Sequence, residues 1–177
     1  MTKDDILSAG IKIIESEGFD RLTLSSLASE LGVKKPSIYH YFASKDEIIR
    51  ELYVRARELL RKHTFRVDFT LSAEEVLTAV YLHWEALWRD EEIGPYLSLL
   101  SQRESIDEEA YEILASLNLM TEAQSDAVID NLVMRKKLVC EDKKFLSFLF
   151  SSAAMAALKK EERDLTFIKS FVSVFSQ

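Results

Sequence analysis

Apolar residues recur every three or four positions along almost the whole chain, which is the spacing of one face of an α-helix. The pattern is sharpest between residues 23 and 47, where a short apolar face is followed by Gly32. Glycine just past the last periodic residue usually ends a helix, because it adopts left-handed backbone angles without strain. Thr23 precedes this helix and can cap its N-terminus. The face consists of Leu24, Leu27, Ala28 and Leu31.

A second short helix is predicted from about Lys35 to Phe42, because Pro36 suits the first turn of a helix. Ile38 and Phe42 are available for packing, and the other positions carry cations, hydroxyls and phenols. Side chains of these kinds bind phosphates and base edges in the major groove of DNA. The pattern therefore favours a DNA-binding helix-turn-helix, although many helical hairpins carry a glycine turn and bind no DNA.

Capping patterns mark the helices on either side of this pair. Thr2 with Asp5 approximates a capping box for the first helix, and Ser44 with Glu47 forms another for the fourth. The fourth helix begins at Lys45. There the free N–H groups and the positive end of the helix dipole already attract a phosphate, so a lysine adds charge where an anion is welcome.

A longer helix is predicted from a capping box at Ser72 and Glu75 to about Arg89. One broad face of this helix carries large aromatic side chains, and such a stripe is most often simply core. The competing interpretation is a chamber in which the rings stack a flat or apolar ligand and His83 or a hydroxyl orients it. The aromatic residues on this face are Tyr81, Trp84 and Trp88.

Three further helices are expected in the middle of the chain. The first follows the break at Gly94 and ends near Arg103, and the second opens at Ser105. A capping box from Thr121 to Gln124 predicts that a third, separate helix begins there.

The last third of the chain predicts two strongly apolar helices, over residues 145–158 and 165–175. A chain this short has few internal helices left to cover two such surfaces. Two helices from each of two subunits would form a symmetric four-helix interface, and the alternative is that both helices are internal core of a monomer. The candidate interface residues are Phe150, Ala153, Ala154, Ala157, Ile168, Phe171 and Phe175.

The composition favours an all-α chain of one or two domains. Of the 177 residues, 47% are hydrophobic, and four glycines and two prolines leave little room for hairpins or long loops. The single cysteine, Cys140, cannot form an internal disulfide, and the first residues carry acids where a signal peptide needs bases. We therefore expect a cytoplasmic protein.

Charge is divided unevenly along the chain. Residues 1–66 hold 12 Lys or Arg and 10 Asp or Glu, whereas residues 67–177 hold 11 and 20. A local basic face can bind DNA while an acidic bulk limits nonspecific adhesion. The net charge of −7 therefore does not argue against nucleic acid as a partner.

Patterns typical of enzymes, metal sites and membrane spans are missing from the sequence. There is no glycine-rich phosphate loop, and one cysteine with the scattered His40, His63 and His83 lacks metal-ligand spacing. The longest uncharged stretch, residues 145–158, is too short to cross a bilayer. We expect no catalysis, no cofactor, no bound metal and no membrane segment.

The run LASELGVKKPSIYHYFASKDEII resembles the DNA-binding domain of the TetR/AcrR family of bacterial repressors, and the likeness covers roughly residues 4–53. It is carried by Gly32-Val33, Pro36, Tyr39, Phe42 and Lys45. The resemblance implies an N-terminal three-helix helix-turn-helix domain at residues 1–48 and a helical ligand-binding and dimerisation domain at residues 49–177. It also implies a homodimer that binds a near-palindromic, double-stranded DNA operator.

Carried over position by position, the resemblance implies a set of DNA contacts. Base contacts would come from Lys35 and Ser37, with Pro36 and Tyr39 as further candidates. Backbone contacts would come from Thr23, Ser25, Tyr41 and Lys45. Lys34 departs from the small hydroxyl residue often found before this helix, which weakens a capping bond but adds a partner for phosphate or guanine.

The family further implies a small-molecule inducer of unknown identity, bound among the helices from Ser72 to Leu138 beside Tyr81, His83, Trp84 and Trp88. Two alternatives stay open at this point. One is a helical dimer that binds a small molecule or protein partner without operator binding. The other is a transcriptional activator, which shares the fold.

Overall fold

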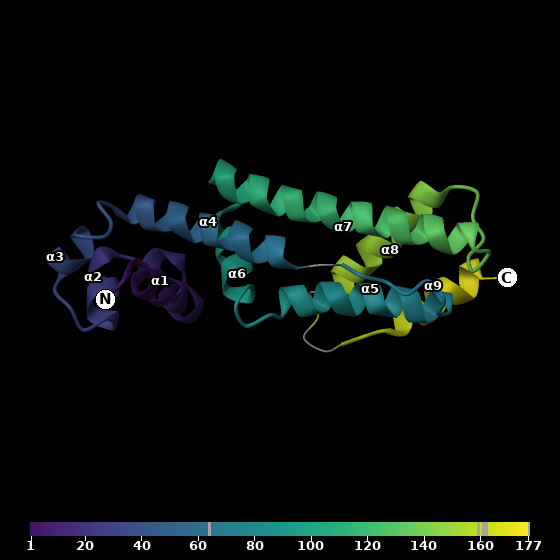
Figure 1. The fold of residues 1–177 in the computed structure, drawn as a ribbon, viewed down its shortest axis with the longest axis horizontal. Coiled ribbons are helices and arrows are strands. Elements are labelled where there is room, and N and C mark those ends of the chain that lie inside the picture. Colours follow the sequence, from purple (N-terminus) through teal and green to yellow (C-terminus); the bar gives the residue numbers. More distant parts are fainter. Residues whose placement is uncertain (64, 159, 161–162, 177) are drawn as a thin grey trace. The chain divides into compact units, whose positions relative to one another are not determined.

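The computed structural model describes residues 1–63, 65–158, 160 and 163–176, and within them it contains helices and no strand (Figure 1). This confirms the expected all-α class. The helices are α1 (Lys3–Glu17), the 3₁₀ turn η1 (Phe19–Arg21), α2 (Leu24–Glu30), α3 (Lys35–Tyr39), α4 (Lys45–Lys62), α5 (Ala73–Trp88), α6 (Gly94–Arg103), α7 (Glu108–Met134), α8 (Lys143–Leu158) and α9 (Thr166–Phe175).

The described residues form two compact units. The first combines Met1–His63 with Arg89–Ala115, and the second combines the described parts of Thr64–Trp88 and Ser116–Gln177. Helix α4 therefore lies in the same compact unit as α1 to α3, and α7 contributes residues to both units. A boundary of function after residue 48 remains a prediction.

Apolar faces of α1, α2, α3 and α4 build the core of the first unit. Helix α1 packs against α2, α4 and α6, and α4 packs against α6. The side chains that this core buries almost completely are Ile6, Ile14, Leu22, Leu27, Ile38, Phe42, Ile48 and Leu52.

Local signals set most helix ends in this unit. The capping box of Thr2 and Asp5 is present, and Thr23 caps α2 by accepting from the Ser26 N–H at 3.0 Å. Gly32 has φ +64°, the left-handed angle expected after the helix.

Two details differ from expectation in the first unit. Helix α3 ends at Tyr39 rather than Phe42, although the N–H groups of residues 41 and 42 still donate to the Ile38 carbonyl. At the start of α4, Ser44 accepts from the Glu47 N–H as expected, but the Glu47 carboxylate accepts from the Ala43 N–H at 2.7 Å. The capping box is therefore displaced by one residue.

The prediction of a separate helix beginning at Thr121 was wrong, because α7 runs unbroken through it. The Thr121 side chain is buried, and its hydroxyl donates to the Asn118 carbonyl at 2.8 Å instead of accepting from an N–H. A buried stripe continues past this point at helical spacing, through Leu117, Ser125 and Val128. A capping-box sequence can therefore lie inside a helix when apolar residues continue at helical spacing on both sides of it.

Helix α5, α8, α9 and the later part of α7 form the second unit. The capping box of Ser72 and Glu75 opens α5, as predicted. Between α7 and α8, the buried Ser147 hydroxyl donates to the Ser125 hydroxyl at 2.9 Å. The core of the second unit includes Val76, Leu77, Val80, Tyr81, Trp84, Val128, Ile129, Leu132, Leu146, Phe150, Ala154, Ala157, Ile168 and Phe171.

Among the described residues, no helix is both long enough and apolar enough to cross a membrane, and no cluster of His, Cys, Asp or Glu could hold a metal ion.

Replacing Gly32 or Gly10 by alanine should change the stability of the protein in opposite directions. Gly32→Ala should lower the free energy of unfolding by about 1 kcal/mol, because alanine is strained at φ +64°. Gly10→Ala should raise it by about 0.5–1 kcal/mol, because Gly10 lies inside α1 and its new Cβ would meet the Leu22 Cδ1 at an ordinary 3.5 Å. Urea unfolding followed by circular dichroism measures both, and a loss of stability in both variants would contradict the analysis.

Candidate functional site

Helix α3 presents polar side chains to solvent. Lys35 and Pro36 are exposed at its start, Ser37 is partly exposed, and Tyr39 is 50% exposed. Ile38 lies completely buried between them. Because Ile38 is the one residue of this short helix that is buried, the neighbouring cation, hydroxyl and phenol stay exposed or partly exposed.

The turn and helix before α3 extend this exposed surface. Thr23 and Ser25 at the start of α2 are exposed, as is Lys34 immediately before α3. The Val33 N–H donates to the Ala28 carbonyl at 2.9 Å, which fixes the turn that joins the two helices. Lys34 makes no capping hydrogen bond to α3, as the departure from a hydroxyl residue predicts.

Tyr41 and Lys45 are more strongly engaged within the protein than the other candidates. The Tyr41 hydroxyl donates to the Met1 carbonyl at 2.6 Å. The Lys45 ammonium lies over the Phe19 ring, 4.3 Å from its centroid. Burial, and after it the charge of Arg103, lowers the pKa of Lys45. A phosphate could therefore recruit Lys45 only by competing with the Phe19 ring.

Known proteins resemble the chain in this region. Residues 6–52 match the family described as bacterial regulatory proteins, tetR family. An uncharacterized helix-turn-helix transcriptional regulator of Mycobacterium tuberculosis is 31% identical over 55 residues, which are 31% of this chain and 25% of that protein. The class D tetracycline repressor protein of Escherichia coli is 24% identical over 131 residues, 69% of this chain and 55% of the repressor.

Residues 6–52 are thus similar to the helix-turn-helix domain of the tetR family of bacterial regulatory proteins. The matched segments span at most about half the length of these two relatives. The fold is shared with a tetR-family regulatory protein from Rhodococcus RHA1, with a TM-score of 0.68 at 12% identity, over 98% of this chain and 96% of that one.

The residues expected to bind a ligand lie on α5 in unequal environments. Tyr81 and Trp84 are completely buried, and the Trp84 indole donates to the Gln124 amide oxygen at 2.7 Å. His83 is partly exposed and its ring lies 5.2 Å from that of Phe65. Trp88 is partly exposed, but its indole nitrogen is buried and has no hydrogen-bond partner among the described residues. Burial of the first two is what a core stripe predicts, and a ligand role for all four remains a prediction.

The candidate dimer residues are mostly used inside the subunit. Phe150, Ala154, Ala157, Ile168 and Phe171 are buried against other helices of the second unit, and Ala153 and Phe175 are partly exposed. Helix α8 has a second apolar set that is exposed, made of Phe145, Phe148 and Leu149. Sequence periodicity missed this division because α8 is apolar over most of its circumference.

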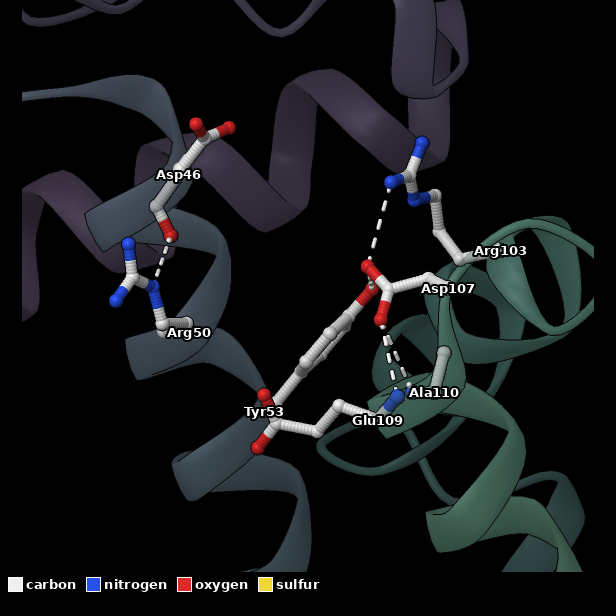
Figure 2. A network of polar contacts seen from close by, with 7 residues as sticks. All are labelled: Asp46, Arg50, Tyr53, Arg103, Asp107, Glu109 and Ala110. Atoms are coloured by element: carbon white, nitrogen blue, oxygen red, sulfur yellow. Dashed lines mark hydrogen bonds and ion pairs between the residues drawn. The ribbon is translucent and has the colours of Figure 1, made fainter.

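Sequence reasoning also missed a polar network that joins α4 to the start of α7 (Figure 2). Figure 2 shows Tyr53 pointing toward Asp107, and its hydroxyl donates to the Asp107 carboxylate at 3.0 Å. Arg103 donates to the same oxygen at 3.3 Å, while the other carboxylate oxygen accepts from the N–H groups of Glu109 and Ala110. Asp107 thus ties together α4, the end of α6 and the first turn of α7.

A second set of contacts continues from this network to η1. The Arg103 guanidinium lies over the Phe19 ring at 4.3 Å from its centroid, the same distance as the Lys45 ammonium. The Phe19 N–H donates to the Gln102 amide oxygen at 3.3 Å. Lys45, the first residue of α4, is therefore placed by the same ring that holds the end of α6.

The polar network shifts the pKa values of its members. Burial raises the pKa of Tyr53 to about 12, so the phenol stays protonated and can donate. Burial alone would raise the pKa of Asp107, but the hydrogen bonds from Tyr53 and Arg103 outweigh it and lower that pKa. A carboxyl with a lowered pKa stabilises the fold above its unfolded value of about 3.9, and this contribution is lost as the pH falls through the folded pKa.

Removing the Tyr53 hydroxyl should therefore destabilise the protein in a pH-dependent way. Tyr53→Phe should lower the free energy of unfolding by about 1 kcal/mol at pH 7, because the ionised Asp107 loses a donor. The difference from wild type should be smaller at about pH 3 than at pH 7, because the Tyr53 hydroxyl favours the ionised form of Asp107 and lowers its pKa. Urea titrations at both pH values test this, with Tyr111→Phe as the control at a tyrosine that is 61% exposed. Equal losses at both pH values would exclude the link to Asp107.

Proposed function

We propose that this TetR-family regulator is a ligand-responsive repressor that binds a near-palindromic, double-stranded DNA operator as a homodimer in the cytoplasm. The observation that carries the proposal is the exposed face of α3, where one buried isoleucine leaves Lys35, Ser37 and Tyr39 directed to solvent. In a helix-turn-helix, such a second helix enters the major groove. The dimer axis would then set the spacing of two half-sites.

The proposed DNA contacts fall into two groups. Lys35, Pro36, Ser37 and Tyr39 would contact bases from α3, and Lys34 would contact phosphate or guanine. Thr23, Ser25, Tyr41 and Lys45 would contact the DNA backbone. Their partial use inside the protein makes Tyr41 and Lys45 the weaker members of the set.

Regulation would follow from a population shift. An inducer bound by the second unit changes operator affinity only through its preference for a dimer whose two reading helices are wrongly spaced. The polar network at Asp107 supports α4 as the element that responds, because α4 begins at Lys45 and carries Tyr53.

For the dimer interface we propose the exposed face of α8 rather than its buried face. Phe145, Phe148 and Leu149 lie on the opposite side of the helix from Leu146, Phe150 and Ala154. An exposed apolar face on one helix can pair with its own copy across a two-fold axis. This proposal differs from the prediction made from the sequence, which placed Phe150 and its neighbours in the contact.

The competing function is a helical dimer that binds a small molecule or protein and no operator. An operator selected from random double-stranded DNA, together with the DNA upstream of the chain's own coding region, separates the two by gel shift at two salt concentrations. A repressor should give a discrete complex that weakens steeply with salt. The alternative function predicts no discrete complex at either salt concentration.

Tyr39→Ala should weaken operator binding by about tenfold or more, because it removes an exposed side chain from the centre of the proposed reading surface. Lys45→Ala should have a smaller effect in the same direction. Tyr111→Ala is the matched control, since it removes a tyrosine of comparable exposure, 61% against 50%, from α7. Helix content and dimerisation should not change. Unaltered affinity in the Tyr39 variant would refute the contact assignment.

Phe148→Glu should raise the dimer dissociation constant on the order of 100-fold, because a charge would replace a ring at the proposed interface. Sedimentation equilibrium measures this directly. Leu119→Glu places the same charge on α7 at a residue of similar exposure, and it should leave the dimer intact. Dissociation caused only by the Leu119 variant would move the interface to α7.

A further inference from the structure

The Phe19 ring in η1 carries two cations. The Lys45 ammonium lies 4.3 Å from the ring centroid, and the Arg103 guanidinium lies at the same distance. A cation over an aromatic face is attracted by the negative charge of the π-electrons. All three residues belong to the first compact unit, so this one ring joins the start of α4 to the end of α6.

The two cations are held at the ring unequally. The Arg103 guanidinium also donates to the Asp107 carboxylate at 3.3 Å, and the same carboxylate accepts from Tyr53. Within the described part of the chain, the Lys45 ammonium makes no hydrogen bond and no ion pair, so the ring is its main attachment. Arg103 is therefore fixed, whereas Lys45 can leave the ring.

Lys45 stays at the ring against an opposing charge. Burial and then the charge of Arg103 lower the pKa of Lys45, and the charges of Asp20 and Asp46 raise it by less. A like charge disfavours the ammonium, so the attraction of the ring offsets part of a repulsion. A phosphate would instead be attracted by the ammonium and by the free N–H groups at the start of α4. Lys45 therefore has two competing positions, one on the ring and one on a phosphate.

Phe19 is placed by its backbone rather than by deep burial. Its N–H donates to the Gln102 amide oxygen at 3.3 Å, and the Gln102 amide nitrogen donates to the Ser98 hydroxyl at 3.2 Å. The Phe19 side chain is partly exposed and lines an open groove of about 550 Å³ together with Arg103 and Ile106. A leucine at this position would remove the aromatic face without creating a buried cavity.

We propose that Phe19 is a positioning residue for DNA binding, whose ring holds Lys45 back from the DNA backbone and so limits the affinity for the operator. A phosphate must draw the ammonium off the ring before it can bind it, so Lys45 is only partly engaged with DNA. Arg103 stays over the ring in both positions of Lys45. This inference rests on the proposed function, and it adds Phe19 as a residue that acts through Lys45.

The size of the effect follows from the strength of the ring contact. An exposed contact of a cation with a ring shifts an equilibrium by about two- to fivefold. When the state that can bind is only partly populated, the affinity falls by the same factor. Since a dimer has two copies of Lys45, the two rings would lower its affinity for the operator by about four- to 25-fold.

Phe19→Leu tests the proposal, because it keeps an apolar side chain and removes the aromatic face. It should tighten operator binding by about four- to 25-fold. The slope of log affinity against log salt concentration should become steeper by up to about two, which is one phosphate contact for each subunit. Phe19→Tyr keeps the ring and should bind as wild type does. Fluorescence anisotropy of a labelled operator, titrated with the full-length protein over a range of salt concentrations, measures both quantities.

Phe69→Leu is the matched control. Phe69 is also partly buried, and its ring centroid lies 5.8 Å from the Arg135 guanidinium, but it belongs to the second unit. The substitution removes a ring that holds a cation without affecting Lys45. It should change neither the affinity for the operator nor the salt slope.

A double substitution separates positioning from packing. In the Lys45→Ala background, Phe19→Leu should have no further effect on the affinity or on the salt slope, because no ammonium is left to release. Tightening that persists without Lys45 would overturn the proposal, and so would unchanged or weaker binding by Phe19→Leu alone. Urea unfolding verifies that each variant is folded.

Nuclear magnetic resonance tests the ring contact in the wild-type chain, where no substitution can impair folding. The Phe19 ring current should shift the ε-CH₂ protons of Lys45 upfield from those of Lys144, a lysine that is exposed. Lys45 resonances at the position of the Lys144 resonances would refute the contact and the proposal.

The outcomes distinguish this inference from the proposed function. If wild type and every variant give no discrete complex with an operator, the proposed function fails and this inference fails with it. If wild type binds an operator but the binding does not depend on Phe19 through Lys45, only this inference fails.

Discussion

The reading surface of this protein depends on the burial of two side chains, Ile38 and Phe42. Helix α3 has five residues, and a helix that short has no stability of its own in water. It exists because these two side chains enter the core that α1, α2 and α4 build. The other side chains of α3, including its lysine, its serine and its tyrosine, are not needed for this packing and are exposed or partly exposed. Under the proposed function, specificity for DNA would therefore depend on apolar contacts that touch no DNA.

Each unit contains a carboxylate that is held by other residues, and the two are held in different ways. Asp107 in the first unit is held by donors from three elements that are themselves well packed, so it acts as a fixed joint. Glu85 in the second unit is deeper, but its cation is a mostly exposed arginine from the segment before α9. The first carboxylate is held by groups that lie within the packing of its unit, and the second by a side chain that comes from the surface.

Signals confined to a few residues could be predicted from the sequence. The capping boxes at Thr2 and Ser72 and the left-handed Gly32 are local, and the structure has them as expected. The prediction at Thr121 failed because this capping-box sequence lies within a continuous run of apolar residues at helical spacing. The contacts of Tyr53 with Asp107 and of Glu85 with Arg163 join residues far apart in the chain, so no spacing rule could reveal them. A lone acid between Trp84 and Trp88 was nevertheless a visible anomaly, and the exposed face of α8 was hidden only because both of its faces are apolar.

Helix α8 uses one apolar face to complete its own subunit and keeps another in reserve. If the exposed face forms the proposed dimer interface, a subunit can complete its core before it associates, and partners can then exchange between dimers. The segment proposed to recognise an operator, α3, belongs to the other compact unit. A polypeptide with a defective α3 would then still find mates and trap normal copies in inactive pairs. In a cell that carries both forms, the damaged allele would behave as genetically dominant.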